Sequence, residues 1–186
     1  MKTLSILTLG FGLVLATSTA HSAEKFWWGF STSSYQYEDP GQDEVVTDWD
    51  LFYQKKGKPS PRQNGNYSWT HFEKDLDALK EVGATHFRFS IEWARVEPKP
   101  GVYNEPAIAE YVRRAKLLRD NGITPIVCLQ HFTFPGWATD LSHPERHGWL
   151  NPTLDSHWAI YVKKIVEAMG DTVTIYNNGA KIGDAV

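Results

Sequence analysis

Apolar positions along residues 68–176 switch repeatedly between a helical and a strand period. In residues 68–83 the apolar side chains fall on one helical face, which predicts a first helix. Thr70 and Glu73 have the spacing of a capping box at its start, and Gly83 suits its end. The residues that form the apolar face are Trp69, Phe72, Leu76 and Leu79.

Two strands are predicted next along the chain. The segment THFRFSIEW, residues 85–93, alternates between polar and apolar side chains, which indicates a strand with two different faces. The segment ITPIVCLQHF, residues 123–132, is mostly apolar, as in a parallel strand that is buried on both faces. In the first strand His86, Arg88, Ser90 and Glu92 lie opposite Phe87, Phe89 and Ile91.

Two further helices and a last strand complete the pattern. Pro106 lies in the first turn of a predicted helix that Gly122 ends. A third helix is expected from Leu154 to Met169, with Gly170 after it, and the segment TVTIY begins another strand. Strands and helices that alternate at this spacing predict parallel strands joined by helical crossovers.

Two α/β architectures have such crossovers: an open doubly wound sheet and a closed (β/α)8 TIM-type barrel. No glycine-rich phosphate loop follows a predicted strand, which weakens the case for a nucleotide-binding sheet. Polar and aromatic residues instead gather after the strands, in SYQYED, EWAR and QHFTFPGW. Because a barrel places its active site there, we expect the barrel fold. We expect no cofactor.

The composition is that of an ordinary globular protein. Of the 186 residues, 41% are hydrophobic and 22% are charged, and the formal net charge is -3, which excludes a disordered chain and a strongly basic nucleic-acid binder. The 8 Trp, 8 Tyr and 9 Phe residues supply a core, and some of their rings are candidates for a sugar site. Cys128 is the only cysteine and lies in an apolar segment, so we expect a buried, unreactive thiol.

The amino-terminal residues differ from the rest of the chain. Lys2 precedes an apolar run from about Leu4 to Ala16, and small polar residues follow. This pattern predicts a secretory signal peptide over residues 1–22 and a mature chain over residues 23–186. The apolar run is too short to span a bilayer comfortably. The mature chain is therefore expected to be soluble, away from the membrane, and exported to the periplasm or the outside of the cell.

Four motifs together resemble family-one glycoside hydrolases of the β-glucosidase type. They are FWWGFSTSSYQYED, HFRFSIEWARVEP, NGITPIVCLQHFTFPGW and GWLNP, in the order and spacing of that family, and the resemblance runs from about Phe26 to Tyr176. It implies the first half, about four βα units, of a (β/α)8 barrel. It also implies a retaining mechanism on a small-molecule β-glycoside or oligosaccharide, with no nucleic acid as a partner.

The resemblance also implies roles for individual residues. Gln36 in SYQYE and His131 in LQHF match family residues that contact the sugar at the cleaved end. Phe132 stands where many relatives have Trp, so this position still carries an aromatic ring. Arg88 matches the arginine beside the nucleophilic carboxylate, whose pKa a fixed cation lowers. A plain salt bridge between Arg88 and Glu92, or another acid on the same strand face, is the structural alternative.

Two further features are weaker candidates. Trp137, just beyond HFTFP, is a candidate sugar platform. The segment HPERH, from His143 to His147, has two histidines, but no further ligand is evident in the sequence, so we expect no metal site.

Both catalytic glutamates are expected to be absent from this chain. Retaining glycosidases need two carboxyl groups about 5–5.5 Å apart. In the family the acid/base glutamate lies in an Asn-Glu-Pro after the fourth strand, and the nucleophile follows the seventh strand. The chain stops resembling the family after GDTVTIY, and the acid/base position falls on Asn178 or near Lys181. Neither side chain is a carboxylic acid.

Three interpretations follow from this departure. The first is the amino-terminal half of a β-glycosidase, truncated near the fourth strand and inactive by itself, because a complete barrel takes about 250 residues. The second is a non-catalytic half-barrel that binds carbohydrate. The third is one half of a split enzyme whose partner is the missing barrel half. A half-barrel exposes a strand edge and apolar surface, so poor solubility or aggregation is expected if this half is expressed alone.

An Asn-Glu-Pro tripeptide does occur elsewhere, at residues 104–106 in YNEPA. It follows the second predicted strand rather than the fourth. Asn104 and Pro106 suit the start of a helix, where the helix dipole favours a negatively charged Glu105. We therefore predict that Glu105 begins a helix and is not the acid/base residue.

Overall fold

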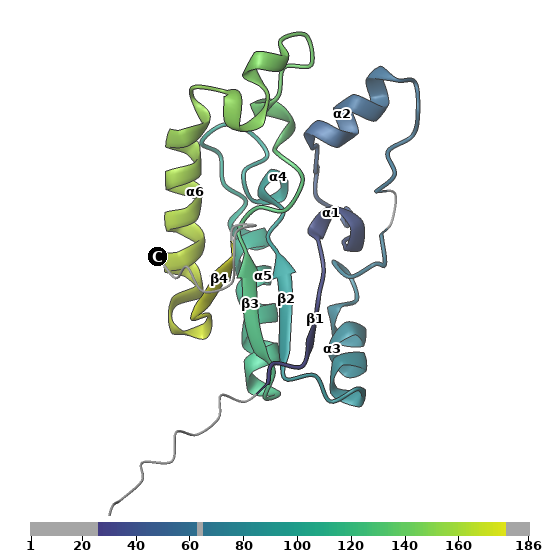
Figure 1. The fold of residues 1–186 in the computed structure, drawn as a ribbon, viewed down its shortest axis with the longest axis vertical. Coiled ribbons are helices and arrows are strands. Elements are labelled where there is room, and N and C mark those ends of the chain that lie inside the picture. Colours follow the sequence, from purple (N-terminus) through teal and green to yellow (C-terminus); the bar gives the residue numbers. More distant parts are fainter. Residues whose placement is uncertain (1–25, 63–64, 178–186) are drawn as a thin grey trace, which may run out of the picture.

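The computed structural model describes residues 26–62 and 65–177, and its centre is a parallel sheet. Four strands follow one another across the sheet in chain order: β1 (Gly29–Ser31), β2 (His86–Ser90), β3 (Thr124–Cys128) and β4 (Ile175–Asn177). Figure 1 shows them side by side and pointing the same way. A doubly wound sheet reverses its strand order, whereas a barrel does not, so this order agrees with the predicted half-barrel.

A helix connects each pair of neighbouring strands. These helices are α3 (Phe72–Glu81), α5 (Glu105–Asp120) and α6 (Leu154–Met169), and all three sequence predictions are confirmed. The chain leaves α5 and α6 through Gly122 and Gly170, whose φ angles of 75° and 48° lie in the left-handed region that glycine adopts at little cost. None of the helices in the described part of the chain is long and apolar enough to cross a membrane.

The start of α3 differs from the prediction. The helix begins at Phe72 with His71 at its N-cap, and no side chain caps it. Thr70 therefore does not form the predicted capping box, because its hydroxyl lies 2.8 Å from Nδ1 of His71. The carboxylate of Asp39 accepts hydrogen bonds from the backbone N–H groups of Trp69 and Thr70 instead, at 2.9 and 3.1 Å.

The start of α5 is as predicted. Asn104 is the N-cap, its side chain accepts a hydrogen bond from the backbone N–H of Ala107 at 3.1 Å, and Pro106 lies in the first turn. Glu105 is the first helical residue and is exposed, and its carboxylate accepts a hydrogen bond from Lys164 at 3.1 Å. The YNEPA segment is thus a helix start.

The two faces of the sheet are as the alternation of β2 predicts. Phe87, Phe89 and Val127 belong to the hydrophobic core that the sheet shares with α3, α5 and α6. The other face carries a cross-strand row in which Arg88 pairs with Ser31 on one side and Ile126 on the other. In β3 the segment from Pro125 to Cys128 is buried throughout, as its continuous apolar pattern predicts.

Short helices cover the carboxyl ends of the strands, at the top of Figure 1. The hydrophobic pattern did not reveal them, because most span less than two turns. In α2 the Thr47 and Asp50 side chains form a reciprocal capping box. The elements are α1 (Ser34–Tyr37), α2 (Asp48–Lys55), α4 (Trp93–Val96), and the 3-10 turns η1 (Gly136–Ala138), η2 (Pro144–Arg146) and η3 (Gly148–Leu150); a further turn, η4 (Gly170–Thr172), precedes β4.

A buried ionic cluster anchors this layer to the barrel helices. The carboxylate of Glu38 lies 3.3 Å from both Arg95 and Arg114. Both guanidinium groups also lie against the Trp69 ring, at 3.8 and 4.4 Å from its centre. Because a buried charge without its partner costs several kcal/mol, the cluster fixes the segment that carries α1 relative to α5.

Candidate functional site

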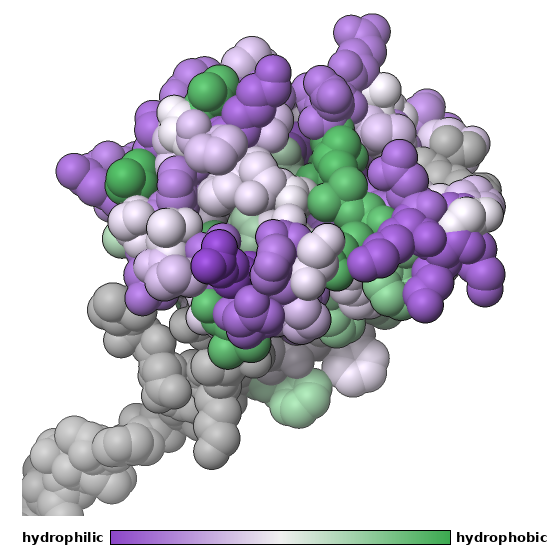
Figure 2. Space-filling view, turned by 90° about the horizontal axis from the view of Figure 1, so that it is seen from above, coloured by the Kyte–Doolittle hydropathy of each residue, from purple (hydrophilic) through white to green (hydrophobic). Residues whose placement is uncertain are grey.

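The predicted site lies at the carboxyl ends of the strands, where α1 follows β1 and residues 129–137 follow β3. Gln36 is in α1 and is exposed, and its Oε1 atom accepts a hydrogen bond from Ser33 Oγ at 2.5 Å. This bond orients the amide, and its nitrogen remains as the donor for another partner. Figure 2 looks down on this end of the molecule and shows a hydrophobic strip bordered by hydrophilic side chains.

His131 lies after β3 and reaches the end of β1, because its ring is hydrogen-bonded to the backbone of Thr32. Its Nδ1 atom is buried and has no hydrogen-bond partner in the described part of the chain. Burial lowers the pKa of the imidazole below 6.5, the positive charge of Arg88 lowers it further, and the bond to Thr32 opposes both effects. The ring is therefore neutral at pH 7 and can both donate and accept a hydrogen bond.

Phe132 presents an aromatic surface beside His131. Its φ angle of 70° is unusual for a bulky residue, and half of its surface is exposed. The ring centre lies 4.4 Å from the His131 ring and 5.7 Å from the Trp49 ring, on which it stacks. Trp49, in α2, also meets the edge of Tyr35. Trp49 was not predicted as a site residue, because α2 has no signal in the hydrophobic pattern of the sequence.

Arg88 lies on the sheet face opposite the helices and makes no ion pair with a carboxylate of the described residues. Its Nη2 donates to Cys128 Sγ at 3.3 Å, and its Nε is buried without a hydrogen-bond partner among them. The alternative salt bridge between Arg88 and Glu92 is not formed, because Glu92 pairs with Arg62 at 2.7 Å. Cys128 is completely buried, as predicted.

Trp137 has contacts separate from those of the other candidates. Its indole N–H donates to the Glu97 carbonyl oxygen at 2.7 Å, and its ring packs against Trp93 and His157. The structure thus brings His131 and Phe132 into contact, places Gln36 at the same end of the sheet, and uses Trp137 for packing. A role of Trp137 in sugar binding stays a prediction.

The two histidines of HPERH point to different carboxylates. His143 Nδ1 lies 2.8 Å from Asp140, and His147 Nε2 lies 3.0 Å from the buried Asp48. The described residues contain no group of three or more potential ligands that could hold a metal ion. His147 and Asp48 instead line an apolar hollow of about 460 Å³ together with Trp49, Phe52, Tyr53 and Leu141.

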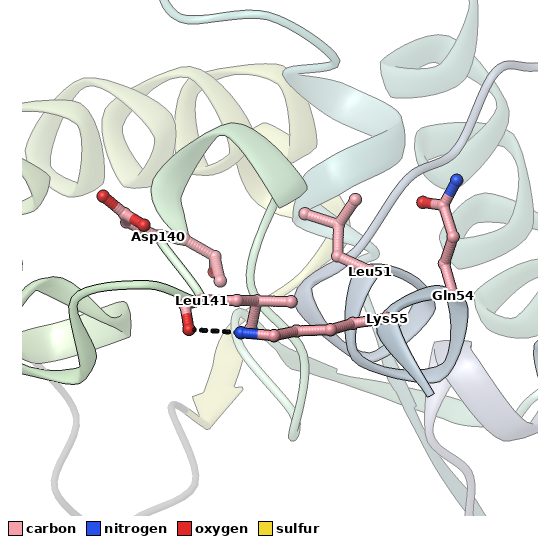
Figure 3. A pocket seen from close by; sticks show the side chains of 6 residues that line it. Leu51, Gln54, Lys55, Asp140 and Leu141 are labelled. Atoms are coloured by element: carbon pink, nitrogen blue, oxygen red, sulfur yellow. Dashed lines mark hydrogen bonds between the residues drawn. The ribbon is translucent and has the colours of Figure 1, made fainter. Parts of the chain in front are cut away.

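A second hollow, of about 490 Å³, lies between α2 and the segment after η1 (Figure 3). Leu51, Gln54 and Lys55 line it from α2, and Lys55 Nζ donates to the carbonyl oxygen of Leu141 at 2.9 Å. This hollow shares no residue with the candidate site, and the hydrogen bond joins α2 to the loop that faces it. We assign it no catalytic role.

The acid/base position was predicted to fall on Asn178 or near Lys181. Both residues lie outside the described part of the chain. The predicted signal peptide, residues 1–22, also lies outside them.

Comparison with known proteins identifies the family. The sequence profile of Glycosyl hydrolase family 1 matches residues 18–179. Beta-glucosidase A of Acetivibrio thermocellus is 31% identical over 159 residues, which cover 81% of this chain and 34% of the relative. The cytosolic beta-glucosidase of Homo sapiens is 33% identical over 158 residues, which cover 80% of this chain and 32% of the relative. The chain thus spans about a third of the length of these relatives.

Solved structures agree with this result. The crystal structure of a beta-glucosidase from Exiguobacterium marinum matches with a TM-score of 0.71 and 32% identity, and the match covers 84% of this chain and 35% of the other. The family 1 β-glucosidase from Thermotoga maritima matches with a TM-score of 0.69 and 29% identity over 81% of this chain and 34% of the other. The four-stranded sheet is half of the TIM barrel of these enzymes, and the chain belongs to glycosyl hydrolase family 1.

Proposed function

We propose that this chain is the sugar-binding amino-terminal part of a retaining β-glycosidase that hydrolyses β-O-glycosidic bonds, and that the isolated chain has no hydrolytic activity. Family membership supports the reaction class. The observation that carries the binding role is the placement of Gln36, His131 and Phe132 at the carboxyl end of one parallel sheet. The substrate is a small-molecule β-glycoside or oligosaccharide, and no cofactor is required.

The three side chains offer complementary contacts to a sugar. The Gln36 amide is oriented by Ser33 and has an N–H group left to donate to a hydroxyl. The neutral imidazole of His131 has a buried Nδ1 without a partner in the described part of the chain, which suits a second hydroxyl. The exposed ring of Phe132 provides an apolar surface for the C–H face of the sugar.

We assign no catalytic role to Glu92 or Glu38, two buried glutamates near the carboxyl ends of the strands. Glu92 is at the end of β2, but it is 1% exposed and ion-paired with Arg62. Glu38 is likewise buried in its arginine cluster. A general acid and a nucleophile must both reach the scissile bond, so we assign both roles to glutamates outside the described residues. Arg88, whose charge is not neutralised by a described carboxylate, would then lie beside the nucleophile.

Equilibrium binding tests the proposal directly. Titration of the chain with methyl β-D-glucoside, followed by NMR, should show saturable binding that Gln36→Ala removes. Gln54→Ala is the matched control, because Gln54 is an exposed glutamine on α2 away from the candidate residues, and it should bind as the wild type does. Release of nitrophenol from 4-nitrophenyl β-D-glucoside by the isolated chain would contradict the absence of activity.

We also propose that the chain is exported. The support for export is the pattern of a basic start, an apolar run and small residues in positions 1–22. Mass spectrometry of protein from the periplasm or the medium of the host should find the chain beginning near residue 23. Intact protein that begins at Met1 and stays in the cytoplasm would refute this part alone.

The remaining part of a barrel is the proposed partner. β1 is a terminal strand of the sheet, and Phe30 on β1 is about half exposed. Phe30 and Val82 line an apolar hollow of about 340 Å³ between β1 and α3. Co-expression with a chain that carries the later strands of a family member should give a soluble complex that hydrolyses 4-nitrophenyl β-D-glucoside. Failure of the two chains to co-purify would contradict the split arrangement.

A further inference from the structure

Glu92 connects three segments at the carboxyl end of the sheet, although it is almost completely buried. Its Oε2 atom accepts hydrogen bonds from Arg62 at 2.7 Å and from Ser34 Oγ at 3.3 Å. Its Oε1 atom accepts one from Thr133 Oγ1 at 3.2 Å. These partners belong to the loop after α2, to α1, and to the segment after β3. A single carboxylate therefore joins segments that are distant in sequence.

Two of these partners adjoin the candidate sugar-binding residues. Ser34 and Gln36 belong to the same four-residue helix, and Thr133 directly follows His131 and Phe132. The Ser34 end of this helix is also fixed to β2, because its backbone N–H donates to Ser90 Oγ at 2.6 Å. Movement of the Glu92 carboxylate would thus be transmitted to both segments that carry the site.

The position of Glu92 is itself fixed by its surroundings. Its backbone N–H donates to Tyr111 Oη at 3.0 Å, and that hydroxyl donates to Glu38. On the other side, Arg62 lies over the Tyr35 ring, 4.7 Å from its centre. The carboxylate is thereby held between α5 and the aromatic residues of the loop layer, and it has little freedom to move.

We infer that Glu92 is the positioning residue that holds the Gln36 and His131 segments in register for sugar binding. The sugar-binding part of this inference rests on the proposed function. Glu92 touches no substrate in this role, because it is buried beneath the two segments. Burial raises the pKa of Glu92, whereas the guanidinium of Arg62, 2.7 Å away, favours the charged carboxylate. That charge matters, since hydrogen bonds to a charged acceptor are about twice as strong as neutral ones.

Glu97 provides a matched control. It is also a buried glutamate in the segment after β2, at the C-terminal end of α4, and its exposure is 0%. Its carboxylate is bound by Trp93 Nε1, the backbone N–H of Gly101 and His157 Nδ1, each at 2.8 Å. None of these partners belongs to the segments that carry Gln36 or His131.

Hydrogen exchange measured by mass spectrometry separates the two glutamates. Glu92→Gln should increase amide exchange in residues 32–37 and 129–135, because the neutral amide holds Ser34 and Thr133 weakly. Glu97→Gln should increase exchange in residues 98–103 and 154–158 and leave the former segments as in the wild type. If exchange in Glu92→Gln rises uniformly over the chain, or rises no more in these segments than in Glu97→Gln, the inference is wrong.

If Glu92→Gln does not fold, a milder variant can test the same inference. Thr133→Val preserves shape and the Glu92 charge while removing the hydroxyl that donates to both carboxylate oxygens, at 3.2 and 3.4 Å. It should raise exchange in residues 129–135 and leave residues 32–37 unchanged. Unchanged exchange in both segments would show that the carboxylate does not hold the loop.

The affinity for sugar is a second measurement, and it would not change if Glu92 had only a structural role. The affinity for methyl β-D-glucoside should fall about tenfold in Glu92→Gln and stay within about twofold in Glu97→Gln. Equal affinities in the wild type and in Glu92→Gln would refute the role in sugar binding. Absence of sugar binding by the wild-type chain would remove the proposed function, whereas the exchange data would still decide whether Glu92 positions the two segments.

Discussion

The guanidinium of Arg88 donates to the thiol of Cys128 at 3.3 Å, across the neighbouring strands β2 and β3. A thiol is a weak acceptor and, in its neutral form, carries no charge to balance the cation. The positive charge of Arg88 therefore acts on its surroundings, and it lowers the pKa of His131 in addition to the effect of burial. Arg88, which is expected beside the nucleophile, is thus coupled electrostatically to His131, which is expected to contact the sugar.

Replacement of Arg88 should raise the pKa of His131. Arg88→Met removes the positive charge that disfavours the imidazolium, and burial of the ring then remains as the cause that lowers the pKa. A titration of the His131 Cε1–H resonance by NMR measures this shift. Arg113→Met is the control, because Arg113 is a partly exposed arginine that pairs with Glu73 and Glu110 on the helices. A His131 pKa that is unchanged or lower in Arg88→Met would contradict the coupling.

Asn104 and Glu105 should differ in their effect on stability. Asn104→Ala removes the N-cap of α5 and a hydrogen bond to Asp43, and should lower the free energy of unfolding by about 1 kcal/mol. Glu105→Gln removes a solvent-exposed pair with Lys164 and should change it by less than about 0.5 kcal/mol. Urea denaturation measures both values. Loss of sugar binding in Glu105→Gln, with stability unchanged, would return Glu105 to the list of functional candidates.

The elements that sequence periodicity predicted are those stabilised by a regular apolar face. Leu76 and Leu79 in α3, and Tyr161 and Ile165 in α6, are all in the core, and their spacing is visible in the sequence. The capping box at Thr70 was wrong because Asp39, from a distant loop, satisfies the backbone N–H groups there. Local signals therefore located these helices but not the contacts that fix where each one begins.

The site was only partly predictable, for a related reason. Gln36, His131 and Phe132 lie in motifs that the sequence displays. Glu92, in contrast, contacts Ser34, Thr133 and Arg62 at separations of 58, 41 and 30 residues, and no sequence period reports such contacts. The stacking of Trp49 on Phe132 likewise depends on where α2 lies relative to the segment after β3. These relationships exist only in the folded chain.

Gly29 should be essential for the pairing of β1 with β2. A Cβ atom at this position would lie 2.1 Å from the carbonyl oxygen of His86, and backbone cannot move aside as a flexible side chain can. Gly29→Ala should therefore lower the free energy of unfolding by about 2–3 kcal/mol. Gly57→Ala is the control, because a Cβ there meets nothing within 4 Å and only its φ of 65° opposes the change, at about 1 kcal/mol. A smaller loss in Gly29→Ala than in Gly57→Ala, measured by urea denaturation, would contradict this.

Asp48 should make stability fall as the pH rises. Burial raises its carboxyl pKa above 3.8, while hydrogen bonds from Phe134 N–H and His147 oppose the shift. The folded state thus binds this proton more tightly than the unfolded state, and stability is lost as the pH rises from 3.8 through the folded pKa. Asp48→Asn does not titrate and can still accept from Phe134, so the stability of the wild type relative to this variant should decrease over that range.

His147→Ala should strengthen the pH dependence of stability that Asp48→Asn removes. Removal of the imidazole takes away a hydrogen bond and a positive charge that favour the ionised form of Asp48. The pKa of Asp48 should then rise further, so the loss of stability with rising pH should be larger than in the wild type. Urea denaturation of the wild type, Asp48→Asn and His147→Ala between pH 4 and pH 8 gives the three slopes. Equal slopes in the three proteins would show that Asp48 is not the group responsible.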